Sequence, residues 1–271
     1  MNLSISEFTF DPWATWLDQG GDPAAFPYGY AMWLILLPVN MLLGLTNIPL
    51  IYSYFFTLLL IDTMLLLLLN ELIEKRKLFL IIGYWLSPVV IIASYGLGLN
   101  DLIPTFLLMA AILKTQKIKI FQAGLFLALA ISAKFSMVMT LPFFLIYLFN
   151  KKALRIYIPE FLKAIFIILL ILGIPFFLSD GALHMLSSNS ELEKIYLLSI
   201  DLGGNSSVFL IPLTYALLLY SIWRIKRLNF NLFVSTTGLS FLLIVLMTPA
   251  SPGWFIWIVP FLVFYQSQSD K

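Results

Sequence analysis

The chain has 271 residues, of which 61% are hydrophobic and 11% are charged, and its mean hydropathy is +0.97. A soluble domain carries about 25% charged residues, so this composition excludes an ordinary soluble protein and predicts one polytopic membrane domain. The net charge of +2 comes from short, scattered basic clusters, so we expect no nucleic-acid partner. The lack of cysteine excludes disulfides and thiolate chemistry, and a single histidine excludes a His-rich metal site.

An acidic, aromatic segment, FTFDPWATWLDQGGDPAAFPYGY, opens the chain and contains no Lys, Arg or His. Residues 1–29 have neither a basic nor an apolar signal region, so we expect no cleavable signal peptide. The apolar stretch 30–46 follows, and we expect it to form a re-entrant or interfacial helix bent at Pro38. The predicted domains are an outer loop with this non-crossing helix at 1–48 and a transmembrane helical domain at 49–271.

The remaining chain alternates long apolar stretches with short polar ones. A bilayer core of about 30 Å needs roughly 20 apolar helical residues, and fewer where charged ends reach the surface. The candidate spans are 49–70, 78–94, 102–116, 118–134, 136–149, 161–178, 208–223, 231–248 and 253–266. Lys134 interrupts this series, so we expect two short helices to meet near it. The predicted fold is all-α: a polytopic integral membrane protein with about nine transmembrane helices plus the outer helix.

Basic residues predict the orientation. If 30–46 does not cross, 14 of the 16 basic residues lie on one side, which the positive-inside rule makes cytoplasmic. Only Lys134 and Lys194 then lie outside, together with nine of the 14 acidic residues. We therefore expect the N-terminal loop outside and the C-terminus inside, in a bacterial inner membrane. An acidic, aromatic outer face suits carbohydrate, because rings stack on sugar faces and carboxylates accept hydroxyl protons.

The long outer loop contains one local signal. Ser188 and Glu191 have the spacing of a capping box, in which the Ser side chain caps a helix start. This pattern predicts a short amphipathic helix on the membrane surface that buries Ile195, Leu197 and Leu198.

Asp11 is followed by Pro12 and two tryptophans in DPWATW. In a catalytic interpretation, its carboxylate deprotonates an acceptor hydroxyl while the neighbouring rings hold a sugar. In a structural interpretation, Asp11 caps a short interfacial helix that starts at Pro12, and Trp13 and Trp16 belong to the aromatic belt. The sequence leaves both interpretations open.

Further polar positions lie in the predicted outer segments. Asp22 follows a Gly-Gly pair and precedes Pro23, so a turn or a helix cap competes with a substrate contact. Asn100 and Asp101 lie at the outer mouth of a span, where they would cap that helix or contact substrate or a metal ion. His184 would carry a proton or contact phosphate, although a lone loop histidine more often has neither role.

Two charges lie within or beside apolar stretches, where an ionisable side chain is costly and commonly functional. Lys134 would pair with an anionic lipid phosphate, pair with an outer carboxylate, or extend to the membrane surface. Asp62 lies inside a predicted span, away from the acidic outer face. We favour a contact between helices over chemistry for Asp62.

Four stretches share features with one family, in the family's order. GGDPAAFPYGYAMWLILLP is similar to its outer loop and non-crossing helix, and LLLIDTMLLLLL to its next helix with a lone Asp. SPVVIIASYGLGLNDLIPTFLLMAAIL, with LALAISAKFSMVMTLPFFLIYL, is similar to a GQxD pattern and a helix pair with a Lys near its turn. TPASPGWFIWIVPFLVFY is similar to a late SPQYFxWxxPF motif. The chain thus resembles the GT-C superfamily of membrane glycosyltransferases, above all polyprenol-phosphate-mannose-dependent and GPI-anchor mannosyltransferases.

The resemblance implies an enzyme that moves a hexose, mannose or glucose, from a polyprenyl-phosphate donor to a lipid-linked or glycan acceptor on the outer face. It implies an inverting displacement at the anomeric carbon, with Asp11 as the base or Glu7 in its place, and with Lys134 offsetting charge on the leaving phosphate. The side chains expected to shape the sugar site are Trp13, Trp16, Tyr28 and Trp254. Further substrate contacts are expected from Asp22, Asn100, Asp101 and His184.

The chain departs from the family at three points. Leu99 and Gly253 stand where the family has Gln, and Met1 falls within the acidic loop that normally follows a first helix, so we expect that helix to be missing. The alternative function is a non-catalytic subunit or carrier for lipid-linked saccharides on the same scaffold. An ion-coupled transporter would need paired charges in mid-membrane, and only Asp62 is so placed. The sequence leaves metal dependence and oligomeric state open.

Overall fold

The computed structural model describes residues 9–46, 48–73, 77–204 and 206–268, and most of them are helical. The N-terminal half contains α2 (Pro12–Asp18), α3 (Tyr30–Gly44), α4 (Leu50–Leu72), α5 (Lys77–Leu80), η1 (Ile81–Trp85), α6 (Pro88–Val90), η2 (Ile91–Gly96), α7 (Leu102–Gln116), α8 (Ile120–Ala133) and η3 (Phe135–Thr140). The remainder contains α9 (Leu141–Asn150), α10 (Lys152–Arg155), α11 (Ile158–Ile168), η4 (Leu169–Gly173), α12 (Ile174–Leu178), α13 (Asp180–Ser187), η5 (Ser190–Tyr196), β1 (Ser199–Gly203), β2 (Ser206–Phe209), α14 (Leu210–Trp223), α15 (Phe230–Met247) and α16 (Trp254–Gln268).

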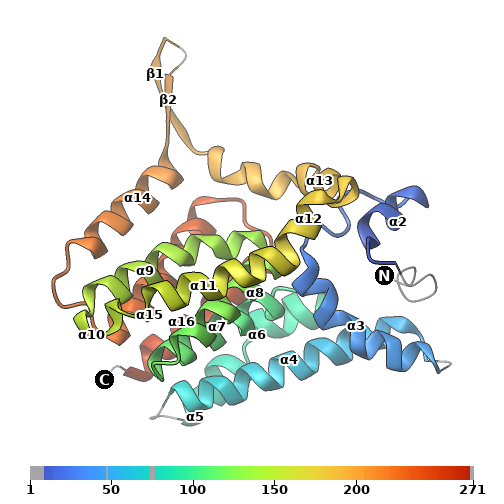
Figure 1. The fold of residues 1–271 in the computed structure, drawn as a ribbon, viewed down its shortest axis with the longest axis horizontal. Coiled ribbons are helices and arrows are strands. Elements are labelled where there is room, and N and C mark those ends of the chain that lie inside the picture. Colours follow the sequence, from blue (N-terminus) through green and yellow to red (C-terminus); the bar gives the residue numbers. More distant parts are fainter. Residues whose placement is uncertain (1–8, 47, 74–76, 205, 269–271) are drawn as a thin grey trace.

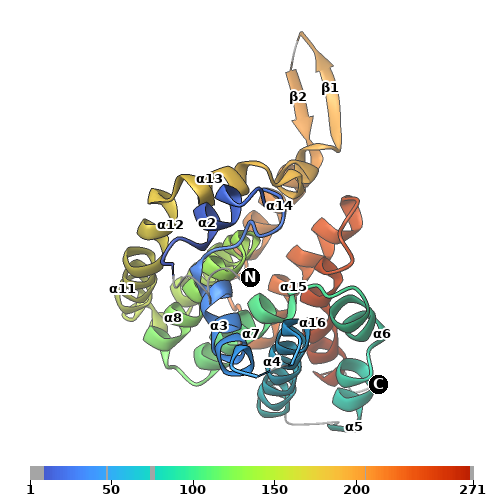
Figure 2. The ribbon, with the colours of Figure 1, turned by 90° about the vertical axis from the view of Figure 1, so that its right-hand side faces the viewer.

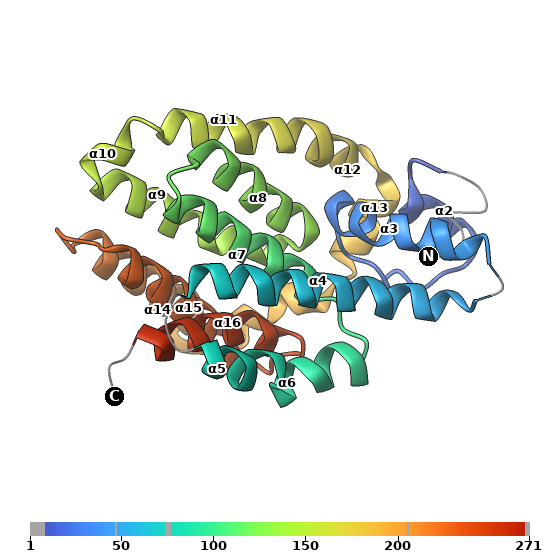
Figure 3. The ribbon, with the colours of Figure 1, turned by 90° about the horizontal axis from the view of Figure 1, so that it is seen from below.

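The long helices form a bundle whose axes run in broadly similar directions (Figure 1). Figure 3 shows α4, α7, α8 and α11 side by side, with α16 on the far side of α4 and α7. The short helices α2 and α13 lie together at one end of this bundle (Figure 2). The β1–β2 hairpin projects away from the helices.

Within the part of the chain that the structure describes, four helices are long and apolar enough to cross a membrane: 51–72, 77–96, 158–178 and 230–247. Their most apolar windows are only 17–44% buried inside the protein, so much of their surface is free to meet lipid. Apolar patches this large are unusual on a soluble monomer. The chain is therefore a helical protein with several candidate membrane spans, and the count of nine stays a prediction.

The other predicted spans are shorter helices. The structure has apolar helices over Tyr30–Gly44, Leu102–Gln116, Ile120–Ala133, Phe135–Asn150 and Leu210–Trp223, each of 10–17 residues. The predicted break at Lys134 is confirmed, because α8 ends at Ala133 and Lys134 adopts an extended backbone before η3 begins. Pro38 lies inside α3, as predicted. That α3 does not cross the membrane stays a prediction.

The all-α prediction is compatible with this mostly helical structure, which adds one short hairpin. Residues Ser199–Gly203 and Ser206–Phe209 pair as an antiparallel hairpin. Gly203 has φ +83° and Gly204 φ +60°, the left-handed conformation that glycine supplies to a tight hairpin turn. The adjacent glycines Gly203 and Gly204 were the sequence feature from which this hairpin turn could have been predicted.

Several chain segments with basic residues meet at one end of the bundle. Lys117, after α7, pairs with Glu71 at the end of α4. Phe149 in α9 stacks on Trp223 in α14 with centroids 5.2 Å apart, and Arg155 donates to the Phe149 carbonyl. Lys75, Arg76 and Lys271 lie outside the described residues. The predicted gathering of basic loops is consistent with these contacts, and the assignment of this end to the cytoplasm stays a prediction.

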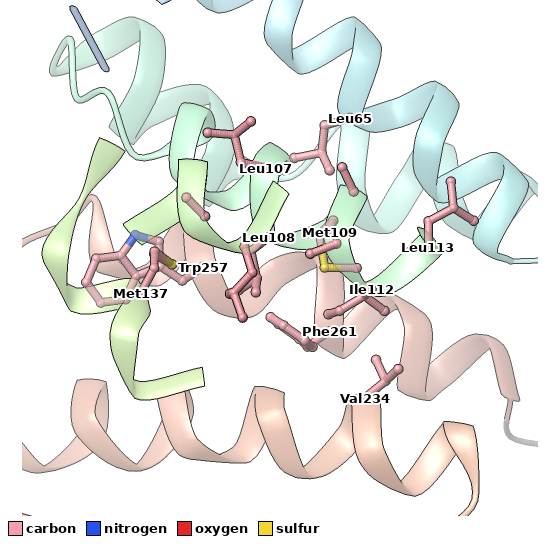
Figure 4. Close-up of a cluster of buried hydrophobic side chains, with 14 of the residues drawn as sticks. Leu65, Leu107, Leu108, Met109, Ile112, Leu113, Met137, Val234, Trp257 and Phe261 are labelled. Atoms are coloured by element: carbon pink, nitrogen blue, oxygen red, sulfur yellow. The ribbon is translucent and has the colours of Figure 1, made fainter. Parts of the chain in front are cut away.

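The hydrophobic core connects the helices of the bundle. Figure 4 shows Leu65 of α4, Leu108 of α7, Val234 of α15 and Phe261 of α16 in one cluster of hydrophobic side chains. All four side chains are buried. This packing holds α7 and α16 against each other, and the start of each helix carries residues of the candidate site described below.

The N-terminal segment packs onto the bundle rather than forming a separate body. Asn40 of α3 and Ser53 of α4 are hydrogen bonded, and the amide of Ala31 donates to the Ser132 hydroxyl. Gly29 lies so close to α8 that a Cβ there would be 2.2 Å from the carbonyl oxygen of Ser132. Residues near Gly29 are thereby fixed beside the end of α8.

Candidate functional site

A polar pocket of about 150 Å³ lies where the N-terminal segment, the starts of α7 and α16, the α8–η3 junction and η5 meet. Its lining comprises Ala24, Pro27, Tyr28, Leu99, Asp101, Lys134, Phe135, Ser136, Leu186, Asn189, Glu191, Ser251 and Trp254. We call this cavity the polar pocket. It contains four of the predicted site residues: Tyr28, Asp101, Lys134 and Trp254.

A buried ion pair forms the centre of the polar pocket. The Lys134 ammonium is 2.6 Å from Asp101 Oδ1, and the two side chains are only 13% and 3% exposed. The Trp257 indole N–H donates to the same oxygen at 2.7 Å. The ammonium also lies over the rings of Tyr28 and Trp257, 5.5 and 5.1 Å from their centroids, which favours a cation. Asp101 therefore supports the charged form of Lys134 in a buried site.

Gly253 makes room for this ion pair. A Cβ at position 253 would lie 2.0 Å from Asp101 Oδ2 and 2.8 Å from its Cγ, far inside any allowed contact. The carboxylate cannot move aside freely, because Oδ1 is already fixed by Lys134 and Trp257. The Gly at the position where the family resemblance expects Gln thus has a local steric reason.

The hydroxyl of Tyr28 lies among charges. Burial raises its pKa, Lys134 lowers it, and the carboxylates of Asp101 and Glu191 add to the rise. The Asn100 side chain also lowers the pKa of this hydroxyl. Tyr28 stays protonated at neutral pH as a result, so it remains a hydrogen-bond donor at the pocket wall.

The η5 segment forms the opposite part of the lining. Asn189 caps η5 by accepting a hydrogen bond from the amide of Glu191 at 3.1 Å. Glu191 Oε1 pairs with Lys194 at 2.7 Å, and the Lys194 ammonium lies 5.7 Å from the centroid of the Trp254 ring. Trp254 stacks on Trp257 with centroids 5.3 Å apart. These contacts tie η5 to the start of α16.

The predicted capping box at Ser188 and Glu191 is wrong. Ser188 ends α13, the cap is Asn189, and the segment is a 3-10 helix. Asn189 takes the cap position instead of Ser188, because an Asn side chain can accept a hydrogen bond from the amide two residues further along the chain. Asp101 is the N-cap residue of α7, the position that the capping interpretation expects. Its carboxylate caps no amide of the described helix and instead bonds Lys134 and Trp257.

An apolar groove of about 250 Å³ adjoins the polar pocket. It runs over α8, η3, α11, η4 and α12, and Ser132 is its only lining residue with a polar side chain. Pro27, Phe135 and Leu186 line both cavities. Phe135 and Phe177 in the lining are each 49% exposed, so the groove is open at the side of the bundle. We call it the apolar groove.

Asp11 lies outside the polar pocket lining. Its carboxylate caps α2 by accepting the Ala14 amide at 3.0 Å, as the structural interpretation expects. Its role as a base stays a prediction, and Glu7, the other carboxylate considered, lies outside the described residues. His184 is exposed on α13 and also lies outside the lining.

Trp13 and Trp16 hold the acidic segment in its folded shape. Trp13 is 1% exposed, packs edge-on against Tyr30 and Phe176, and donates to the carbonyl oxygens of Phe26 and Tyr28. This burial disfavours the belt interpretation for Trp13, which also lies outside the polar pocket lining, and its contact with substrate stays a prediction.

The second tryptophan of the segment closes a turn. Trp16 donates to the carbonyl of Asp22 at 2.9 Å. The Asp22 carboxylate accepts the Ala24 amide at 2.8 Å, which confirms the turn at this position. Neither Trp16 nor Asp22 lines the polar pocket, and their contacts with substrate stay predictions.

Asp62 confirms the favoured interpretation of a contact between helices. It is 3% exposed in α4 and accepts hydrogen bonds from the hydroxyls of Tyr84 in η1 and Tyr95 in η2, the latter at 2.8 Å. Its two oxygens thus join α4 to the segment before α7. Asp62 is not part of the polar pocket.

Two residues of the site were not predicted from the sequence: Glu191, which lines the polar pocket, and Trp257, which bonds Asp101. Trp257 lies one helical turn after Trp254, so both face the same side of α16. Glu191 was assigned only to a cap. The three-residue spacing of the tryptophans in SPGWFIW could have predicted that Trp257 faces the same side as Trp254. The residues next to Glu191 in the sequence do not indicate that η5 folds over the pocket.

Within the described ranges, no group of three or more His, Asp or Glu side chains is arranged to hold a metal ion. Comparisons of the chain with protein-family models, curated proteins and solved structures found no match.

Proposed function

We propose that the chain is a GT-C-type membrane glycosyltransferase. It moves a hexose, mannose or glucose, from a polyprenyl-phosphate donor to a lipid-linked or glycan acceptor at the outer face of a bacterial inner membrane. The observation that carries the proposal is that the apolar groove and the polar pocket are adjacent and share Pro27, Phe135 and Leu186 in their linings. A molecule with a long apolar chain and an anionic, hydroxyl-rich head matches both cavities at once.

The phosphate of the donor is placed beside Lys134. A lysine ammonium has three N–H donors, and Asp101 accounts for one of them. The remaining donors serve an anion whose charge grows as the sugar leaves, and the buried surroundings strengthen that interaction. Asp101 keeps the ammonium in place when the pocket is empty.

The apolar groove receives the polyprenyl chain. Its volume of about 250 Å³ accommodates only the isoprene units nearest the phosphate, and the rest of the chain extends past the exposed rings of Phe135 and Phe177 into lipid. Burial of each apolar Å² contributes about 25 cal/mol. The groove therefore supplies affinity without selecting the sugar.

The sugar is placed between Tyr28 and Trp254. The Trp254 ring lines the pocket and the Tyr28 hydroxyl remains a donor at neutral pH. Aromatic faces and polar groups together are common in sites that bind amphipathic ligands. Asn100, whose side chain lowers the pKa of Tyr28, supplies a further polar group beside that hydroxyl.

The test is sugar transfer in membranes that contain the chain, with radiolabelled polyprenyl-phosphate mannose and polyprenyl-phosphate glucose as donors. We expect label to move from the donor to an acceptor with wild type and to fall at least 10-fold with Trp254→Ala. Phe255→Ala is the matched control, because Phe255 is 41% exposed and lies outside the pocket lining. Absence of transfer from either donor contradicts the enzyme proposal.

The second candidate is a non-catalytic subunit or carrier for lipid-linked saccharides. One observation favours it: Asp11, the carboxylate that the resemblance implies as the base, already caps α2. This candidate predicts that wild type binds a polyprenyl-phosphate sugar with the same dependence on Lys134 but leaves the sugar attached. Recovery of intact donor after long incubation separates it from the enzyme.

A further inference from the structure

The two carboxylate oxygens of Glu191 differ in their contacts. Its Oε1 is paired with Lys194, whereas Oε2 is buried and has no hydrogen-bond partner among the described residues. A buried acceptor left without a donor costs about 1–3 kcal/mol, and more when charged. Glu191 also lines the polar pocket, so a ligand hydroxyl entering the pocket is a suitable missing donor.

Asp101, the other carboxylate of the lining, is poorly suited to take a proton. Its Oδ1 accepts both the Lys134 ammonium and the Trp257 indole, so protonation would break the ion pair that holds the pocket together. Glu191 has a free oxygen and a single cationic partner outside the lining. The two carboxylates thus have different roles, one positioning and one reactive.

We propose that Glu191 is the general base that accepts the proton of the acceptor hydroxyl. This inference rests on the proposed function and assigns the base to η5 rather than to Asp11. As the acceptor oxygen bonds to the anomeric carbon, its proton moves to Glu191 Oε2. The bond from the anomeric carbon to the phosphate oxygen breaks, and its electron pair leaves on the polyprenyl phosphate beside Lys134. The proton on Glu191 then passes to water.

Lys194 positions this base. Its ammonium bonds Oε1 and lies over the Trp254 ring, so the carboxylate is held from the side away from its unpartnered oxygen. The Asn189 cap fixes the backbone amide of Glu191. A base held by a second group in this way is the usual arrangement in general acid–base sites.

The test compares Glu191→Gln with Glu193→Gln, which removes an exposed glutamate two residues away on the same segment. Sugar transfer from the radiolabelled donor and binding of unlabelled polyprenyl phosphate are measured on the full chain in membranes. We expect Glu191→Gln to lower transfer by about 10²–10⁴-fold, the usual contribution of a general base, while phosphate-lipid binding changes less than threefold. Glu193→Gln should keep both, and Glu191→Asp should retain part of the transfer.

The outcomes distinguish the two proposals. Wild-type transfer that survives Glu191→Gln but is abolished by Asp11→Asn overturns the assignment of the base and leaves the enzyme proposal in place. Equal loss of transfer and of phosphate-lipid binding in Glu191→Gln also overturns it, because that pattern indicates a structural role. Absence of transfer by wild type overturns both proposals.

Discussion

Gly253→Ala perturbs the centre of the polar pocket without replacing a charged residue. The added Cβ would lie 2.0 Å from Asp101 Oδ2, and Gly253 is not among the glycines with a positive φ, so backbone strain does not contribute. The carboxylate must therefore rotate away from Lys134 and Trp257. The variant tests whether those two contacts hold the pocket together.

The expected cost follows from what the carboxylate loses. Breaking a buried ion pair by disabling one partner costs about 3–5 kcal/mol, and this pair is only 13% and 3% exposed. A chain of this size shifts its midpoint of heat denaturation by about 2–4 °C per kcal/mol. We therefore expect Gly253→Ala to lower that midpoint by roughly 6–20 °C in detergent.

The assay is heat denaturation of the purified chain, followed by intrinsic tryptophan fluorescence. Gly96→Ala is the control, because a Cβ there meets its nearest atom, in Ile92, at 3.9 Å. We expect the control to be neutral or slightly stabilised, and we expect Asp101→Ala to remove most of the effect of Gly253→Ala in the double variant. If Gly253→Ala is as stable as Gly96→Ala, the steric account of this position is refuted.

Three further perturbations address other contacts by the same denaturation assay. Trp257→Phe removes the indole donor to Asp101 but keeps an aromatic ring, so it should cost about 1.5–3 kcal/mol; an unchanged midpoint would show that this bond contributes nothing. Tyr95→Phe removes one of the two donors to Asp62 and should cost a similar amount, whereas a neutral result would mean that the carboxyl group finds another donor. Gly29→Ala places a Cβ 2.2 Å from a backbone carbonyl of α8 and should prevent normal accumulation of the chain; wild-type yield and midpoint would contradict the close approach.

The sequence predicted structural features that depend on only one or two neighbouring residues, such as helix ends and helix caps. Lys134 interrupts an apolar stretch, and the helix does end at Ala133. Asp11 precedes a proline at a helix start, and it does cap α2. Asp62 is a lone carboxylate in a span, and it does find partners on neighbouring helices. In each case the cost of a buried charge or an uncapped helix end limits the possible outcomes.

The polar pocket could not be predicted in the same way. Asp101 is 33 residues from Lys134 and 156 residues from Trp257, so their meeting depends on how α7, α8 and α16 pack. Glu191 reaches the pocket only because η5 folds back over the start of α16. Their charge made Asp101 and Lys134 candidate site residues in the sequence. That they pair with each other follows only from the packing of the helices.

The most direct test of the account is photolabelling with a polyprenyl phosphate that carries a photoreactive group on its first isoprene units. The account predicts crosslinks to peptides of α8, α11 or α12. It predicts their loss in the double variant with Lys134→Gln and Asp101→Asn, which replaces the ion pair by two neutral side chains and leaves the net charge of the pocket unchanged. Labelling confined to the separate groove around Tyr52 and Phe56, or labelling that the double variant leaves unchanged, would contradict the placement of the donor phosphate beside Lys134.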